Sequence, residues 1–146
     1  MRRLVLLVAA GTLAASGFAF AAGLPGIPGA FLPYKHWHRV NAKPIRPTPT
    51  TAHGADVKNV YASKPATGGR YPYGTIVVKE GLTRKFVSLI ATMRKVKGAD
   101  AKHGDWVFVE YARSSATSRF SKIADGAVCW SCHQLAKKTD WIFTRK

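Results

Sequence analysis

The sequence predicts an α+β domain that is mainly an antiparallel β-sheet with a few short helices. Its 146 residues contain several short runs rich in β-branched and aromatic residues, which favour strands. Turns that contain glycine or proline separate these runs. Strands of this length with turns between them predict an antiparallel sheet on which small helices pack.

Residues 1–21 have the layout of a secretory signal peptide. Arg2 and Arg3 precede an apolar run from Leu4 to Phe20, and Ala19-Phe20-Ala21 is a small-x-small cleavage pattern. Small and polar residues interrupt the run and no basic cluster closes it, which favours a cleaved signal. An uncleaved membrane anchor is the alternative, because the run has a borderline length for spanning a bilayer. We therefore expect a periplasmic protein.

The chain is strongly basic, with 23 Lys and Arg against 7 Asp and Glu and a formal net charge of +16. In a cytosolic protein such an excess would suggest nucleic acid as the partner. Nucleic acid is mostly absent outside the cytosol, and the basic residues are dispersed, so no nucleic acid partner is expected. The charge favours anionic partners, of which an acidic redox protein is the first candidate.

Two segments precede the strands. The Gly/Pro-rich residues 22–30 are expected to form a linker, because glycine is conformationally permissive and proline lacks a donor. The domain then covers residues 31–146. Within it, Phe31 to Val40 is expected to hold a short helix or turn, and Pro44 to Gly54 a loop.

Four strands are predicted after these segments. Val57 to Tyr61 is short and β-favouring, Lys64 to Tyr73 is a loop, and Thr75 to Glu80 is a β-branched strand flanked by glycines. Phe86 to Val96 is long enough for a helix, but its β-branched content favours a strand. Trp106 to Tyr111 is the clearest strand. Alternation places Trp106, Phe108 and Glu110 on one face of it and Val107, Val109 and Tyr111 on the other.

A polar stretch from Arg113 to Lys122 leads to the motif Cys129-Trp130-Ser131-Cys132-His133. Two thiols three positions apart with an imidazole directly after them are the signature of covalent c-type haem attachment. Residues three apart lie on one side of a helical turn, so both sulfurs can reach one edge of a porphyrin while His133 binds the iron. We expect one covalent haem c, bound near the C-terminus, and a short helix that continues from the motif through residues 135–138.

Other chemistries compete for these thiols. A redox dithiol belongs near a strand–helix–strand pattern, structural zinc needs four Cys or His ligands, and a disulfide could join Cys129 to Cys132. The remaining candidate zinc ligands are scattered at His36, His38, His53 and His103. Export favours haem, because c-type haem attachment takes place in the same oxidising compartment. A haem-free dithiol or disulfide domain remains an alternative.

The position of the motif argues against an ordinary helical electron carrier. Such a carrier would place the motif near its N-terminus and a ligating methionine toward its C-terminus. Here the motif lies near the C-terminus, and the methionine outside the signal peptide, Met93, lies upstream of it.

The sequence resembles the cytochrome P-460 family and its relatives, the cytochromes c′-beta. The matching pieces are Tyr71–Glu80, Gly104–Tyr111, the motif Cys129–His133 and the closing Thr139–Thr144. The resemblance implies an antiparallel sheet, usually dimeric, that holds a five-coordinate haem with one open axial face. His133 would then be the proximal ligand.

The resemblance also divides members by one covalent feature. In the hydroxylamine-oxidising branch a lysine on the Val-Lys-Glu strand bonds to the porphyrin edge, and the matching residue here is Lys79. The cytochrome c′-beta branch lacks this bond and binds small gases such as nitric oxide at an apolar distal side. The alternative for Lys79 is a solvent-facing charge, and alternation does not decide which side of its strand is buried.

A carboxylate a few residues before the first haem cysteine is a further feature of the hydroxylamine-oxidising relatives. Asp125 is the acid in that window and is the candidate base, although a shift of one residue would put Ala124 there. The alternative is a turn, because Asp125-Gly126 is a favoured turn pair. We therefore expect a haem protein that binds or oxidises hydroxylamine or nitric oxide, with non-catalytic gas binding or electron transfer as the alternative.

Overall fold

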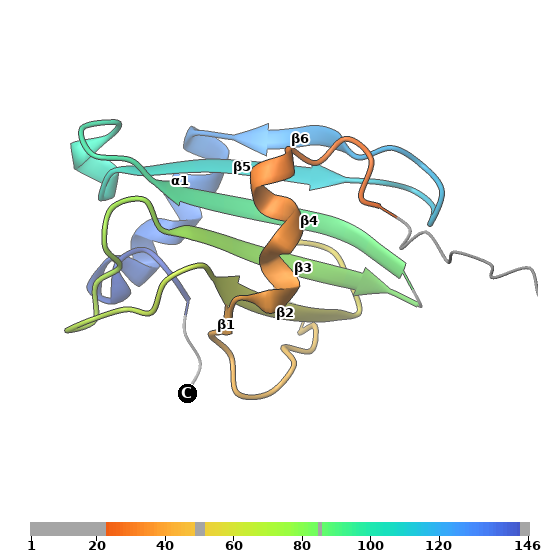
Figure 1. Cartoon of the computed structure of the whole chain (residues 1–146), viewed down its shortest axis with the longest axis horizontal. Coiled ribbons are helices and arrows are strands. Elements are labelled where there is room, and N and C mark those ends of the chain that lie inside the picture. Colours follow the sequence, from red (N-terminus) through yellow and green to blue (C-terminus); the bar gives the residue numbers. More distant parts are fainter. Residues whose placement is uncertain (1–22, 49–51, 85, 144–146) are drawn as a thin grey trace, which may run out of the picture.

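A computed structural model describes residues 23–48, 52–84 and 86–143, so the predicted signal peptide lies outside the described residues. In this part of the chain, six strands form one antiparallel sheet in which every strand pairs with its neighbour in sequence (Figure 1). The strands are β1 (His38–Arg39), β2 (Val57–Ala62), β3 (Ile76–Thr83), β4 (Phe86–Lys95), β5 (Trp106–Ala112) and β6 (Ser121–Asp125).

Short helices cover the two faces of the sheet. The 3₁₀ helix η1 (Gly29–His36) crosses the near face in Figure 1, and α1 (Ala127–His133) lies behind the sheet with the C-terminal segment. The 3₁₀ helix η2 (Ala101–His103) precedes β5, and the 3₁₀ helix η3 (Gln134–Thr139) continues directly from α1. None of the helices in the described residues is long and apolar enough to cross a membrane. The predicted mainly antiparallel fold with a few short helices is confirmed.

Alternation along the strands gives the sheet two buried faces. On the face toward α1, Val77, Trp106 and Phe108 belong to one apolar cluster. On the face toward η1, Val78 and Ile90 belong to another. Because both faces are covered, the central strands are apolar on both sides rather than alternating between apolar and polar.

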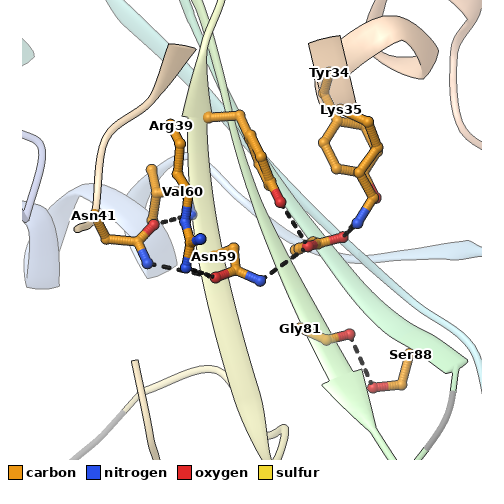
Figure 2. A network of polar contacts seen from close by, with 10 residues as sticks. Tyr34, Lys35, Arg39, Asn41, Asn59, Val60, Gly81 and Ser88 are labelled. Carbon is orange, nitrogen blue, oxygen red and sulfur yellow. Dashed lines mark hydrogen bonds and ion pairs between the residues drawn. The ribbon is translucent and has the colours of Figure 1, made fainter. Parts of the chain in front are cut away.

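A buried carboxylate joins η1 to the sheet (Figure 2). Glu80 on β3 is 1% exposed and accepts hydrogen bonds from Tyr34 (2.8 Å), Asn59 (3.1 Å) and Tyr61 (3.0 Å), and it also pairs with Lys35. Burial alone would raise the pKa of Glu80, but the hydrogen bonds from Lys35, Tyr34 and Asn59 outweigh it and lower this pKa. This network fixes the direction in which Glu80 points.

The strand predictions for 57–61, 75–80, 86–96 and 106–111 are confirmed, with ends that differ by a few residues. The last strand, β6, was not predicted and replaces the end of the expected polar stretch. Its side chains are mostly exposed, including Ile123 at 58%. Strand β6 lies at the edge of the sheet, so it carries no apolar alternation from which a strand could be inferred.

The residues predicted as a Gly/Pro linker, as far as they are described, contact the domain. The amide of Phe120 donates to the carbonyl of Pro25 (2.8 Å), and Ile27 packs with Phe31 and Phe120. Gly26 has φ +94°, and a Cβ there would lie 2.3 Å from the carbonyl oxygen of Phe120. Only glycine fits this close approach.

Candidate haem site

The helix α1 presents the two thiols of the motif. Cys129 is half-buried against the sheet, Cys132 is exposed, and both are free thiols in the structure. Burial, followed by the charges of Glu110 and Asp125, raises the pKa of Cys129 to about 11. Cys129 therefore remains a neutral thiol that can form a thioether, and it is a poor ligand for a cation.

His133, the last residue of α1, is buried at 9% exposure, and its Nδ1 lies 2.6 Å from the carbonyl oxygen of Trp141. A carbonyl only accepts, so Nδ1 carries the hydrogen and Nε2 keeps a free lone pair. Burial lowers the pKa of His133 to about 4, and the nearby charges of Lys79 and His53 also lower it. The ring is thus a neutral imidazole, the form that binds metals.

A buried ion pair holds the carbonyl that orients His133. Asp140 accepts from the amide of Tyr71 (2.8 Å) and pairs with Lys95, and both charged side chains are buried. Asp140 and Trp141 have left-handed backbones (φ 54° and 68°), which non-glycine residues rarely adopt. The closing Asp-Trp segment therefore turns the Trp141 carbonyl toward the imidazole of His133.

A cavity opens between α1 and the sheet beside His133. Its empty space amounts to about 450 Å³ with open solvent included, and strands β2 to β5 supply mostly apolar walls. Phe108 and Phe143 pack against the His133 ring, with ring centroids 5.1 and 5.3 Å from it. The polar residues of the lining are His53, Lys79, Thr92, Glu110, Cys129 and His133.

Lys79 points into this cavity. The structure therefore shows which face of β3 carries Lys79, a question that sequence alternation left open. Its neighbours across the sheet are Val60 and Ala91, and the next residue, Glu80, points to the opposite face. Burial and, to a smaller extent, the neighbouring ammonium of Lys58 lower the pKa of Lys79 to about 8. Among the described residues, Lys79 has neither a hydrogen-bond nor an ion-pair partner, so its amine is free to react.

Asp125 lies away from the cavity lining. It ends β6, its side chain is 55% exposed, and it pairs with Lys122 on the surface (2.7 Å). Gly126 follows with φ +49°, so this position has the geometry of a turn. The structure brings Cys129, His133 and Lys79 together, but it does not bring Asp125 to them.

Two polar residues that sequence reasoning missed line the cavity instead. Glu110 on β5 accepts through Oε1 from Nδ1 of His53 (2.7 Å), and both side chains are nearly buried. The alternation of β5 already placed Glu110 on the face of Trp106 and Phe108, which is the cavity face. No comparable signal existed for His53, which approaches from the loop before β2.

The residues present fit a haem. Two thiols on one helical face, a neutral imidazole with a free Nε2 and an apolar cavity supply the anchors, the axial ligand and the walls that this group requires.

The family model described as Cytochrome P460 matches residues 32–144. None of the curated proteins matches the chain. The matched residues include all six strands, the motif on α1, Lys79, Glu110 and His53.

Proposed function

The chain belongs to the cytochrome P460 family of haem proteins, and from this premise we propose that it is an exported c-type cytochrome that binds or oxidises small nitrogen species, with hydroxylamine and nitric oxide as the candidates. The observation that carries the proposal is that His133, Cys129 and Lys79 line the same cavity, with Nδ1 of His133 bound to the Trp141 carbonyl so that Nε2 is left to bind a metal. The signal-peptide layout of residues 1–21 supports export to the periplasm.

Cys129 and Cys132 would hold the haem as thioethers, and His133 would bind its iron. When bound, the haem supplies a metal that coordinates a small nitrogen ligand and takes up electrons from it. The Trp141 carbonyl keeps the His133 ring in one orientation, and hydrogen-bond donation to it makes the imidazole a stronger ligand. Phe108 and Phe143 shield the imidazole from water.

Oxidation of hydroxylamine releases protons, so the cavity needs an acceptor. Glu110 is suited to this role, because His53 binds its Oε1 while Oε2 has no hydrogen-bond partner among the described residues. Removing a positioned general base typically lowers a rate by about 10²-fold or more. Glu110 thus replaces Asp125 as the candidate base.

The test is hydroxylamine consumption and nitric oxide binding by the purified holoprotein. We expect both ligands to shift the visible spectrum, and Glu110→Gln to lower hydroxylamine consumption about 100-fold. The surface carboxylate variant Asp125→Asn is the matched control and should consume hydroxylamine at the wild-type rate. Unchanged spectra with both ligands would refute ligand binding, and equal rates for the two variants would refute the role of Glu110.

We also propose that electrons leave through an acidic redox protein. The surface beside the motif supports this, because Val128 and Leu135 are 71% and 79% exposed and Lys137 and Lys138 follow them. An apolar centre with a basic rim suits a transient complex with an acidic partner. Electron transfer to such a partner should slow steeply as salt is raised, whereas a salt-independent rate would argue against it.

A further inference from the structure

A second histidine lies near His133 in the lining of the cavity. The rings of His53 and His133 have centroids 6.4 Å apart and planes inclined by 68°, and both residues line the cavity. They come from distant parts of the chain, since His53 lies in the loop before β2 and His133 ends α1.

The two imidazoles have the same hydrogen-bonding pattern. Nδ1 of His133 donates to the Trp141 carbonyl, and Nδ1 of His53 donates to the carboxylate of Glu110. In the neutral form of each ring, the hydrogen is on Nδ1 and Nε2 keeps a lone pair that can bind a metal. A histidine that binds a metal normally donates its other nitrogen to a carbonyl or carboxylate in this manner.

The separation of the rings also fits a shared metal. With metal–nitrogen bonds of about 2 Å on each side and ring centres about 1 Å beyond each nitrogen, two axial imidazoles lie about 6 Å apart. A plain contact between aromatic rings has a similar separation. Such a contact would not explain why both Nδ1 atoms are engaged or why both rings face an apolar cavity.

The loop holds His53 over the cavity at a conformational cost. His53 has φ +63°, a left-handed backbone that costs on the order of 1 kcal/mol or more in a non-glycine residue. Two residues later, Ala55 sits directly on β3, where a Cβ added to Gly81 would lie only 2.7 Å from the Ala55 Cβ. Glu110, on the regular strand β5, then fixes the direction of the ring.

We propose that His53 is the second axial ligand of the iron, on the side opposite His133. The resting iron is then six-coordinate, in place of the open axial face that the family resemblance implies. A small nitrogen ligand binds only after His53 leaves, while Glu110 retains the displaced imidazole beside the site. The inference rests on the proposed function, because it requires a haem anchored at Cys129 and Cys132.

The experiment compares the spin state of the iron in the holoprotein and in His53→Gln. We expect a low-spin spectrum in the wild type, and a high-spin spectrum with unchanged haem content in His53→Gln. His103→Gln is the matched control, because His103 is also a partly buried imidazole bound to a carboxylate through Nδ1 (Asp100, 2.6 Å), but it lies outside the cavity lining. This control should remain low-spin.

Two further measurements keep the inference falsifiable if the substitution disturbs the loop. Imidazole added to His53→Gly should restore the low-spin spectrum. Carbon monoxide binding to the ferrous wild type should level off at high ligand concentration, whereas in His53→Gln it should rise linearly and be at least tenfold faster. A high-spin wild type, or a low-spin His53→Gln, would overturn the axial role of His53. A chain that carries no covalent haem would instead refute the proposed function.

Discussion

Replacing Asp140 by alanine removes the anchor of the carbonyl that orients His133, and we expect a large loss of stability. The substitution leaves the Lys95 charge buried at 8% side-chain exposure without its partner, and leaves the Tyr71 amide without its acceptor. Breaking a buried ion pair from one side costs about 3–5 kcal/mol. This is a large part of the 5–15 kcal/mol that is typical for the unfolding of a domain.

The assay is guanidinium unfolding of the holoprotein, followed by far-UV circular dichroism. Asp125→Ala is the control, because it breaks an exposed pair with Lys122 and should cost at most about 1 kcal/mol. In the His53→Gln background, Asp140→Ala should also weaken the bond between the iron and His133, read as a lower iron–histidine stretching frequency in the resonance Raman spectrum of the ferrous state. The reasoning fails if Asp140→Ala unfolds within 1 kcal/mol of the wild type, or if that frequency does not move.

Four other substitutions or measurements test the remaining steps. Glu80→Gln should destabilise the protein by about 2–3 kcal/mol at neutral pH. Because the folded-state pKa of Glu80 is lowered, the stability difference between wild type and variant should shrink as pH falls below 4.5. A stability difference that stays constant with pH in unfolding experiments would contradict this. If Lys79 is not already cross-linked, its acylation, followed by peptide mass mapping, should reach its full rate just above pH 8, and a rate still rising toward pH 10.5 would contradict the lowered pKa. If Lys79 is bonded to the porphyrin, the intact mass should be lower by two hydrogens than in Lys79→Ala after allowance for the substitution, and the far-red Soret band of the ferrous state should be lost in that variant. Gly81→Ala should cost about 1–3 kcal/mol in chemical denaturation, because its Cβ would meet Ala55, and wild-type stability would refute that close approach. His133→Ala should remove the proximal ligand and change the visible spectrum, and an unchanged visible spectrum would refute its assignment as proximal ligand.

The strands that the sequence predicted are those whose side chains are buried. The β-branched run at residues 75–80 and the aromatic run at residues 106–111 carry a pattern because packing selects it. Strand β6 has exposed side chains, so nothing in its composition separates it from a loop. The face of β3 to which Lys79 points was also unpredictable, because a strand buried on both faces has no polar face that would mark the solvent side.

Some residues of the candidate site could be predicted from the sequence, and others could not. Cys129, Cys132 and His133 are neighbours in sequence, so their spacing alone predicts their chemistry. Glu110 and His53 are separated by 57 positions, and only the folded loop brings them together. Asp125 was favoured because it lies near the motif in sequence, but the end of β6 directs it to solvent.

The opposed charges at the centre of β3 have a consequence for how the sheet assembles. A strand that is apolar on both sides could slide by one residue and still bury its valines, which is a common route to mispaired hairpins. In this chain a slide in one direction would place the Lys79 ammonium between two tyrosines, and a slide in the other direction would place the Glu80 carboxylate, without its four donors, in the apolar cavity. The adjacent Lys79 and Glu80 therefore favour one strand register over the shifted ones. The cavity forms only when the strands pair in this register.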